Sequence, residues 1–351
     1  MDPSRWESGS EFHWLGLPGP GPAATSPWRS GLELSSGRDA LRLTLSLGVK
    51  ERGWRRLWVP DYFCQDVTAA MVRSDLELVP YPDSPLRPQP DPPDARPGEA
   101  ILLVNYFGLR APVHVPRRDG VDIVEDHSHD PSSPWALEST ADFCVASLRK
   151  TFPVPDGGAV WSPVGHPLPS QPPIEAQRRV AVSSKLQGMI LKAMYLEGLP
   201  VDKDAYRALA IRGEGELAVP LVSGMSDVSR AIITAYAAAA WRAAREANRS
   251  ILSARISELD WARLVQPAEG AGVPFSAVIV VDSPERREFV RQRLIAQRIY
   301  PSILWPLEDA VVAPGRAALD LSRRLLSIHC DGRYAGHDME RVGEQVAMAG
   351  T

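Results

Sequence analysis

The stretch Asp122–Trp161, DIVEDHSHDPSSPWALESTADFCVASLRKTFPVPDGGAVW, says most about how this chain folds. A short apolar strand at its start runs into two acids, Glu125 and Asp126. An acidic loop rich in Pro and Ser leads to a second apolar strand, Phe143–Ala146, and a lysine, Lys150, follows that strand. Short apolar strands separated by loops and helices favour a mainly parallel sheet, in which ligands bind at the carboxyl ends of the strands. The stretch therefore predicts an α/β fold with Asp126 and Lys150 at the ligand-binding edge.

The pairing of Asp126 with Lys150 suits an enzyme that holds pyridoxal 5'-phosphate. The lysine amine forms a Schiff base with the cofactor aldehyde, and the aspartate keeps the pyridine nitrogen protonated so that the ring accepts electrons. A lysine taken alone is usually a solvated surface charge, and an aspartate is often a helix cap. The context of Lys150 favours catalysis, because Ser147 lies three residues before it and Gly157-Gly158 lies downstream. The Ser-x-x-Lys spacing also occurs in serine acyl-transferases, but the further motifs of those enzymes are not found here.

Length and composition indicate an ordinary globular protein. With 351 residues, of which 44% are hydrophobic and 23% charged, the chain has room for one large domain and one smaller domain. The net charge of -4, without a long basic run, argues against nucleic acid or an anionic membrane as the main partner. Three widely spaced cysteines and a polar N-terminus without a signal-peptide pattern indicate a cytoplasmic protein.

The chain divides into three parts by pattern. Residues 1–30 are predicted to form an N-terminal arm lying over a surface, residues 31–244 the large domain, and residues 245–351 a small α/β domain. The elements expected in the large domain are a helix at 39–49, strands at 57–59, 76–81, 101–104 and 121–124, a helix at 65–73 and a helix at 174–196. A single long helix over 226–259 is expected to link the domains. A strand at 276–282, a helix at 284–298, a strand at 325–330 and a terminal helix at 338–348 are expected in the small domain.

Several polar residues are predicted to bind the phosphate of the cofactor. Ser36, Gly37 and Arg38 open the first long helix, and a helix N-terminus presents free N–H groups and a positive dipole end to an anion. A plain helix cap is the alternative for these residues. Ser147 is placed so that its hydroxyl group can donate to the same phosphate.

The aromatic ring of the cofactor needs partners of its own. Tyr62 or Phe63, at the end of a strand, is predicted to stack on the pyridine face, and the sequence does not distinguish the two. Asn105 ends another strand and is expected near the same edge. His129 is predicted to contact the pyridine hydroxyl group.

A zinc site is the competing interpretation of the histidines. No further Cys or His pair with metal-ligand spacing completes such a site, so no metal is predicted. Glu125 is expected to be structural.

In this order, the motifs resemble the DegT/DnrJ/StrS family of pyridoxal-phosphate-dependent sugar aminotransferases, which have fold type I. The resemblance covers most of residues 30–345. The matching pieces are Ser35–Leu41, Val59–Phe63, Val104–Gly108, Val124–Asp126 with His129, Ser147–Gly158, and Leu325–Tyr334 followed by Asp338-Met339. The chain departs from the family at Val222–Asp227, where an asparagine that reaches the cofactor phosphate of the neighbouring subunit is usual, and between Lys150 and that run.

The resemblance implies a homodimer with sites at the interface and a ping-pong aminotransferase. In that reaction an amino acid donor, commonly glutamate in the family, gives its amino group to a keto or aldehyde acceptor such as a sugar or natural-product intermediate. Arg38, Arg149 and Arg333 are candidates for binding the donor carboxylate, because a planar guanidinium suits a carboxylate.

Two other readings stay open. The same cofactor supports lyase, dehydratase or decarboxylase reactions, and the altered middle region fits a non-sugar substrate. A non-catalytic regulatory protein is the third reading, and the short N-terminal arm and the presence of both Lys150 and Asp126 argue against it.

Overall fold

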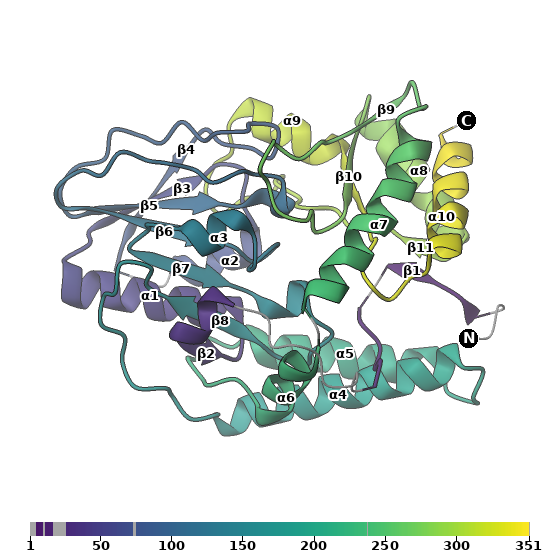
Figure 1. Cartoon of the computed structure of the whole chain (residues 1–351), viewed down its shortest axis with the longest axis horizontal. Helices are drawn as coiled ribbons and strands as arrows, with labels where there is room; N and C mark the ends of the chain where they lie inside the picture. The colour runs from purple at the N-terminus through teal and green to yellow at the C-terminus, as the bar shows by residue number, and fades with distance from the viewer. Residues whose placement is uncertain (1–4, 10, 17–25, 73–74, 237, 351) are drawn as a thin grey trace.

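The structure, a computed structural model, describes residues 5–9, 11–16, 26–72, 75–236 and 238–350. It consists of a large α/β part built on one broad sheet and a smaller part that contains the C-terminus and the helix α7 (Figure 1). No helix among these residues has the length and apolar character needed to cross a bilayer.

The large part is built on a seven-stranded sheet with the strand order β2-β8-β7-β6-β5-β3-β4. The strands are β2 (Leu32–Leu34), β3 (Arg56–Pro60), β4 (Glu77–Tyr81), β5 (Glu99–Val104), β6 (Val121–Asp126), β7 (Phe143–Ala146) and β8 (Gly158–Trp161). The five strands from β3 to β7 pair in parallel, and β8 and β2 add antiparallel pairs at one edge. The predicted mainly parallel sheet of an α/β fold is therefore confirmed.

Both faces of this sheet are covered, which explains the continuous apolar runs of its central strands. On β5, Leu102 and Val104 pack into one cluster and Ile101 and Leu103 into another, as the two-residue period of a strand requires. The first face is covered by the helix α1 (Gly37–Arg52), with α2 (Gln65–Met71) packed against α1. The second face is covered by α3 (Pro134–Glu138) and α6 (Asp227–Ala235). Short 3-10 turns occur at η2 (Pro27–Ser30), η3 (Tyr106–Gly108) and η4 (Leu148–Lys150).

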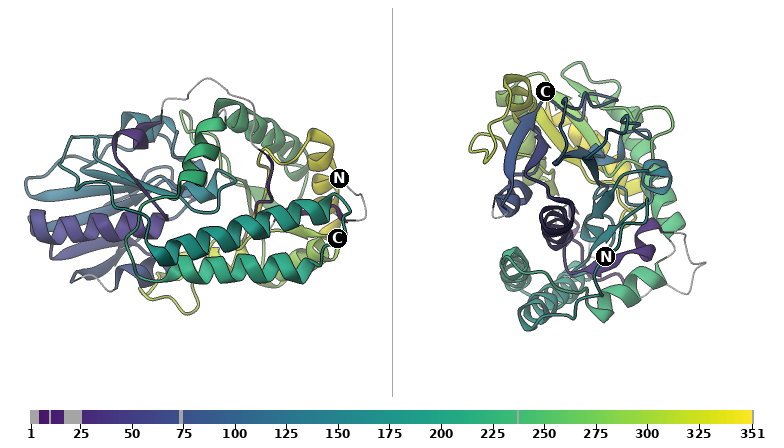
Figure 2. Two further views of the ribbon diagram at one scale, coloured as in Figure 1. Left: turned by 90° about the horizontal axis from the view of Figure 1, so that it is seen from below. Right: turned by 90° about the vertical axis from the view of Figure 1, so that its left-hand side faces the viewer.

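Two long helices, α4 (Ala176–Leu196) and α5 (Lys203–Ala218), form a hairpin along one side of the molecule (Figure 2, left). The sequence predicted α4 but not α5. The hairpin is joined to α1 by a buried ion pair, in which Arg178 of α4 meets Asp39 in the first turn of α1 at 2.9 Å. Neither side chain is exposed to solvent.

The smaller part contains an antiparallel sheet with the order β12-β10-β9. Its elements are α7 (Ala238–Ile256), β9 (Ala262–Leu264), β10 (Ala277–Val281), α8 (Pro284–Ala296), β11 (Ile299–Tyr300), α9 (Arg316–Arg324), β12 (Leu325–Ile328) and α10 (Gly336–Ala349). The N-terminal arm joins this part, because β1 (Ser8–Gly9) pairs in parallel with β11. The domain boundary near residue 245 stays a prediction.

The single long helix expected over 226–259 is wrong. The structure has two helices instead, α6 and α7, because Tyr236 leaves the helical conformation with φ -74° and ψ 122°. The ring of Tyr236 packs edge-on against Trp241, with 5.4 Å between the ring centroids. Residue 237 lies outside the described residues, and the alanine-rich sequence gave no signal for this break.

The buried Arg178–Asp39 pair yields a stability prediction. Replacing Arg178 with Met removes the fully buried counter-ion of Asp39 and leaves only the partly exposed Arg42, at 3.1 Å, as its partner. We therefore expect the free energy of unfolding to fall by about 3 kcal/mol. Urea unfolding followed by circular dichroism measures this change. Arg207→Met is the matched control in the same hairpin, because Arg207 pairs with Asp204 at the surface, and it should change stability by less than about 1 kcal/mol. Equal effects of the two substitutions would contradict the prediction.

Candidate active site

A cavity of about 290 Å³ lies where the carboxyl ends of the central strands meet the N-terminus of α1. Eight of the ten residues predicted from the sequence line it: Ser36, Gly37, Arg38, Phe63, Asp126, His129, Ser147 and Lys150. Further lining residues come from the N-terminal arm (Glu11, Phe12), the α4–α5 hairpin (Lys185, Met189, Glu214), α7 (Arg245) and the smaller part (Phe275, Ser302, Trp305, His329, Asp331, Arg333). The cavity is thus shared by both parts of the molecule.

Asp126 and Lys150 enter this cavity from adjacent parallel strands. Asp126 is the last residue of β6 and pairs with Val145 of β7, and β7 is followed by the turn η4, which ends at Lys150. The Asp126 carboxylate accepts a hydrogen bond from the backbone N–H of Ser128 at 2.8 Å. Burial raises the pKa of Asp126, while the hydrogen bonds from Ser128 and the nearby positive charge of Lys150 limit that rise.

The ammonium group of Lys150 acts on titratable groups from several elements, which places it centrally. Burial lowers the pKa of His129 and of His329, and the positive charge of Lys150 adds to that decrease. Burial raises the pKa of the Cys64 thiol and of Asp126, and the same charge limits that rise. Asp126 ends β6, and His129, His329 and Cys64 follow β6, β12 and β3. A lysine in this position reaches groups on both sides of the cavity.

His129 is held as a neutral ring with a defined proton position. Burial, together with the charge of Lys150, lowers its pKa to about 3. Its Nδ1 atom accepts a hydrogen bond from the backbone N–H of Phe107 at 3.3 Å, so the proton of the neutral ring is on Nε2. The rings of Phe107 and Phe275 pack against it, with centroid distances of 5.2 and 5.1 Å. His129 is therefore a positioned hydrogen-bond donor.

The start of α1 forms a narrow cradle for an anion. The Ser36 hydroxyl group accepts from the N–H of Asp39 at 3.1 Å and caps the helix. A Cβ atom on Gly37 would lie 2.9 Å from the Cβ of Ser147, so only glycine permits this approach between the helix and the turn after β7. The positive end of the helix dipole lies at this edge of the cavity.

Beside the cradle, three basic side chains converge on one carboxylate. Glu214 of α5 pairs with Arg38 at 2.9 Å, with Lys185 at 3.1 Å, and also with Arg149. Because of these three cations, the pKa of Glu214 is held well below its usual range despite burial. Sequence reasoning missed Lys185 and Glu214, since both lie on the hairpin and belong to no motif.

Two of the predicted residues do not reach the cavity. The hydroxyl group of Tyr62 donates to the backbone carbonyl of Leu304, and its ring packs against Trp305 in the core. Phe63, the next residue, also packs against Trp305, but it forms part of the cavity wall. Asn105 is fully buried, and its amide donates to the hydroxyl group of Ser133 at 3.2 Å. The sequence placed both residues at the correct edge of the sheet but gave no signal for the direction of their side chains.

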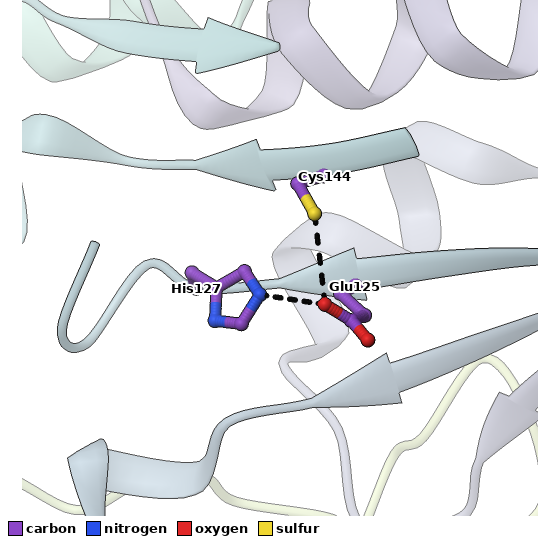
Figure 3. A group of neighbouring side chains, drawn as sticks. All are labelled: Glu125, His127 and Cys144. Carbon is purple, nitrogen blue, oxygen red and sulfur yellow. Dashed lines mark hydrogen bonds and ion pairs between the residues drawn. The ribbon is translucent and has the colours of Figure 1, made fainter. Parts of the chain in front are cut away.

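Glu125, His127 and Cys144 form a separate buried group (Figure 3). Cys144 lies on the face of the sheet covered by α3 and α6, whereas Val145, which lines the cavity, lies on the other face. The Glu125 carboxylate contacts the His127 ring nitrogen at 2.9 Å and accepts from Trp135 and Ser139 at 2.9 and 2.6 Å. Burial raises the pKa of Cys144 well above its ordinary value, which keeps the thiol protonated. The geometry fits the structural role expected for Glu125, and the absence of a metal from this protein stays a prediction.

Comparisons with known proteins show the fold. No protein-family model matches the chain, and no curated protein sequence matches it. Among solved structures, the aminotransferase TlmJ from Streptoalloteichus hindustanus is similar over 91% of this chain and 85% of its own, with a TM-score of 0.61 and 14% identity. The putative sugar aminotransferase Spr1654 from Streptococcus pneumoniae, in its PLP form, is similar over 91% of this chain and 86% of its own, with a TM-score of 0.61 and 12% identity.

A third solved structure, DesV from S. venezuelae in complex with a ketimine intermediate, covers 91% of this chain and 84% of its own length, with a TM-score of 0.58 and 17% identity. The chain therefore has the fold of these aminotransferases, as the sequence motifs predicted. Sequence identities of 12–17% to these structures show the fold of this chain and do not show its reaction.

The buried neutral His129 makes stability depend on pH. Its pKa of about 3 in the folded chain lies below the ordinary value of 6.5, so the unfolded chain takes up a proton first as the pH falls. This contribution to stability is present above pH 6.5 and is lost as the pH falls toward 3. Relative to His129→Gln, the wild type should lose up to about 1.4 kcal/mol of unfolding free energy per pH unit below 6.5. Urea unfolding of both proteins at pH 7, 6 and 5 measures the difference, and a constant difference would refute the depressed pKa.

Proposed function

We propose that this protein is a pyridoxal-phosphate-dependent aminotransferase of the DegT/DnrJ/StrS type. The observation that carries the proposal is that Asp126 and Lys150, from adjacent parallel strands, face one cavity within a fold shared with solved aminotransferases. One of the similar proteins, Spr1654, has been solved in forms named for PLP and PMP. This supports the same cofactor here.

The residues around the cavity fit the cofactor group by group. The cradle of Ser36, Gly37 and Ser147 at the start of α1 would hold the phosphate, since a side chain on Gly37 would close it. Among the described residues, the Asp126 carboxylate accepts a hydrogen bond from Ser128 alone, and it faces the cavity, where it would bind the pyridine nitrogen. His129 would donate from Nε2 to the ring hydroxyl group.

Phe63 is the aromatic residue that would pack on the ring face, because Tyr62 points into the core. The aromatic walls of Phe63, Phe275 and Trp305 would exclude water from the reacting atoms.

When bound, pyridoxal phosphate would supply an electron sink for negative charge at the substrate α-carbon. Lys150 would bind the aldehyde in the resting enzyme and, once displaced by the donor amine, its Nζ atom would carry the proton to and from that carbon. Asp126 would keep the proton on the ring nitrogen. The raised pKa of Asp126 shows that burial is costly for its charge, and a cationic partner would offset that cost.

The donor is proposed to be an amino acid, with glutamate first among the choices, and the acceptor a ketone or aldehyde such as a sugar or natural-product intermediate. Among the similar proteins, DesI was solved in the presence of its TDP-sugar product, which supports a sugar acceptor. The alternative proposal is a lyase, dehydratase or decarboxylase reaction with the same cofactor. The α4–α5 hairpin, which brings Lys185 and Glu214 into the cavity, lies in the region where the sequence departs from the sugar enzymes, and this supports a substrate other than a sugar.

A homodimer is proposed from the family resemblance. Ile190 and Met194, one turn apart on α4, and Ile211 on α5 are exposed apolar side chains that support an interface on the hairpin. Light scattering coupled to gel filtration tests this, and the monomer mass would contradict it. A cytoplasmic location is also proposed, since the three cysteines are free thiols in the structure.

The central claim is tested by absorption spectroscopy of the purified protein. Wild type incubated with pyridoxal phosphate should develop the band of the lysine-bound cofactor, and Lys150→Ala should not. Adding L-glutamate should convert the wild-type band to that of pyridoxamine phosphate, and transamination by Lys150→Ala should be at least about 100-fold slower. Lys50→Ala, an exposed lysine on α1 outside the cavity, is the control and should behave as wild type.

The outcomes separate the proposals. A lysine-bound band that no amino donor converts supports the lyase, dehydratase or decarboxylase alternative. A wild-type protein that forms no such band overturns the assignment of Lys150 and Asp126.

A further inference from the structure

Three arginines are buried among the described residues, and one of them has no acidic partner. Arg110 binds Asp83 with two guanidinium nitrogens, one of them at 2.9 Å, and Arg178 binds Asp39 at 2.9 Å in the same two-pronged way. The third, Arg245, is only 1% exposed and forms no ion pair with any described residue. This contrast within one chain sets Arg245 apart.

The hydrogen bonding of Arg245 is also incomplete. Its guanidinium group donates one long hydrogen bond, from Nη2 to the backbone carbonyl of Thr151 at 3.4 Å, and its Nε atom has no acceptor among the described residues. A guanidinium group has five N–H donors, so most of the donors of Arg245 are unused by the protein.

The two nearest carboxylates are bound by other arginines. Asp130 pairs with Arg242 at 2.8 Å, and Asp331 pairs with Arg333 at 2.7 Å through two nitrogens. Asp130 and Asp331 act on Arg245 only through longer-range electrostatic attraction. Burial lowers the pKa of Arg245. Arg242, Arg333 and Arg245 thus share two carboxylates, which leaves the positive charge of Arg245 uncompensated. A buried charge without a counter-ion destabilises the free protein.

The position of Arg245 shows where a compensating anion would lie. Its side chain lines the cavity from α7, on the wall formed with His329 and Asp331. Its hydrogen-bond acceptor, Thr151, directly follows Lys150 in the chain. The proposed phosphate cradle lies on a different element, at the N-terminus of α1.

We propose that Arg245 binds a carboxylate of the substrate beside Lys150, which makes a carboxylate-bearing amino acid or 2-oxo acid the substrate class on this side of the cavity. The planar guanidinium group matches a carboxylate through two parallel hydrogen bonds. The three arginines named from the sequence are less suited, because Arg38 and Arg149 are paired with Glu214 and Arg333 is paired with Asp331. The inference rests on the proposed function, and it names Arg245 as the residue that selects the carboxylate.

The binding test uses glutarate, a dicarboxylate without an amino group, so that no reaction follows binding. Isothermal titration of the cofactor-loaded protein gives the dissociation constant for wild type and for Arg245→Met. We expect the variant to bind glutarate about 10- to 100-fold more weakly, the loss expected for hydrogen bonds to a charged group. Arg249→Met is the matched control, because Arg249 lies one turn further along α7, outside the cavity, and donates to the carbonyl of Val265.

Titrations with pyridoxal phosphate and with inorganic phosphate test whether the anion at Arg245 is a carboxylate or a phosphate. If Arg245 serves the cofactor phosphate, Arg245→Met loses affinity for pyridoxal phosphate itself, and this overturns the inference. If inorganic phosphate binds the wild type in competition with glutarate and more tightly, the carboxylate assignment is wrong. Wild type that binds no glutarate, or a variant that binds it as wild type does, also overturns the inference. These outcomes differ from failure of the proposed function, which is a wild type that binds no pyridoxal phosphate.

A stability measurement separates a binding role from a structural one. Removing an uncompensated buried charge should leave the urea midpoint of the cofactor-free Arg245→Met protein equal to or above that of wild type. A structural role for Arg245 predicts a lower midpoint, as expected for Arg178→Met, and would contradict the inference. Arg245→Lys provides a second variant, which keeps the charge without the planar pair of donors and should also weaken glutarate binding.

Discussion

The parallel register between β6 and β7 is the constraint on which the candidate site depends. It sets Asp126 opposite Val145, and the turn η4 then carries the chain from the end of β7 to Lys150 within a few residues. Because parallel strands end at the same edge, the acid and the amine face one cavity although more than twenty residues separate them. A shift of this register by one residue would turn Asp126 toward the Glu125 side of the sheet and remove the pair from the cavity.

Buried charge pairs fix the surroundings of that edge. Asp39 lies in the first turn of α1, and its pairing with Arg178 joins the hairpin to the end of the helix that forms the cradle. Glu214 on the same hairpin pairs with Arg38, Arg149 and Lys185, and its single negative charge offsets part of their positive charge. The electrostatic environment of the cavity is therefore set by side chains from elements that are far apart in the sequence.

How far the sequence predicts this site depends on how local the determining interactions are. Strand ends, the capped start of α1 and the Ser147–Lys150 spacing are local patterns, and eight of the ten residues named from them line the cavity. The direction of Tyr62 and Asn105 depends instead on tertiary partners, Leu304 and Ser133, which no local pattern reveals. The break at Tyr236 and the helix α5 were missed because neither has a strong helix-stop or apolar-period signal. Arg245 was missed for a related reason. It is distinguished by having no carboxylate partner among the described residues, and a sequence does not show which side chains pair.

The N-terminal arm has a consequence for how the protein is made. Ser8 and Gly9 pair with Ile299 and Tyr300, and Glu11 and Phe12 form part of the cavity wall together with Arg333. The ribosome synthesises Ser8 and Gly9 long before Ile299 and Tyr300, so the arm can pair only after the residues between them have been made. The large sheet has all of its strands well before then. The cavity is thus completed late in folding, and in a nascent chain the strand ends that carry Asp126 and Lys150 stay uncovered until residues 299–333 have been made.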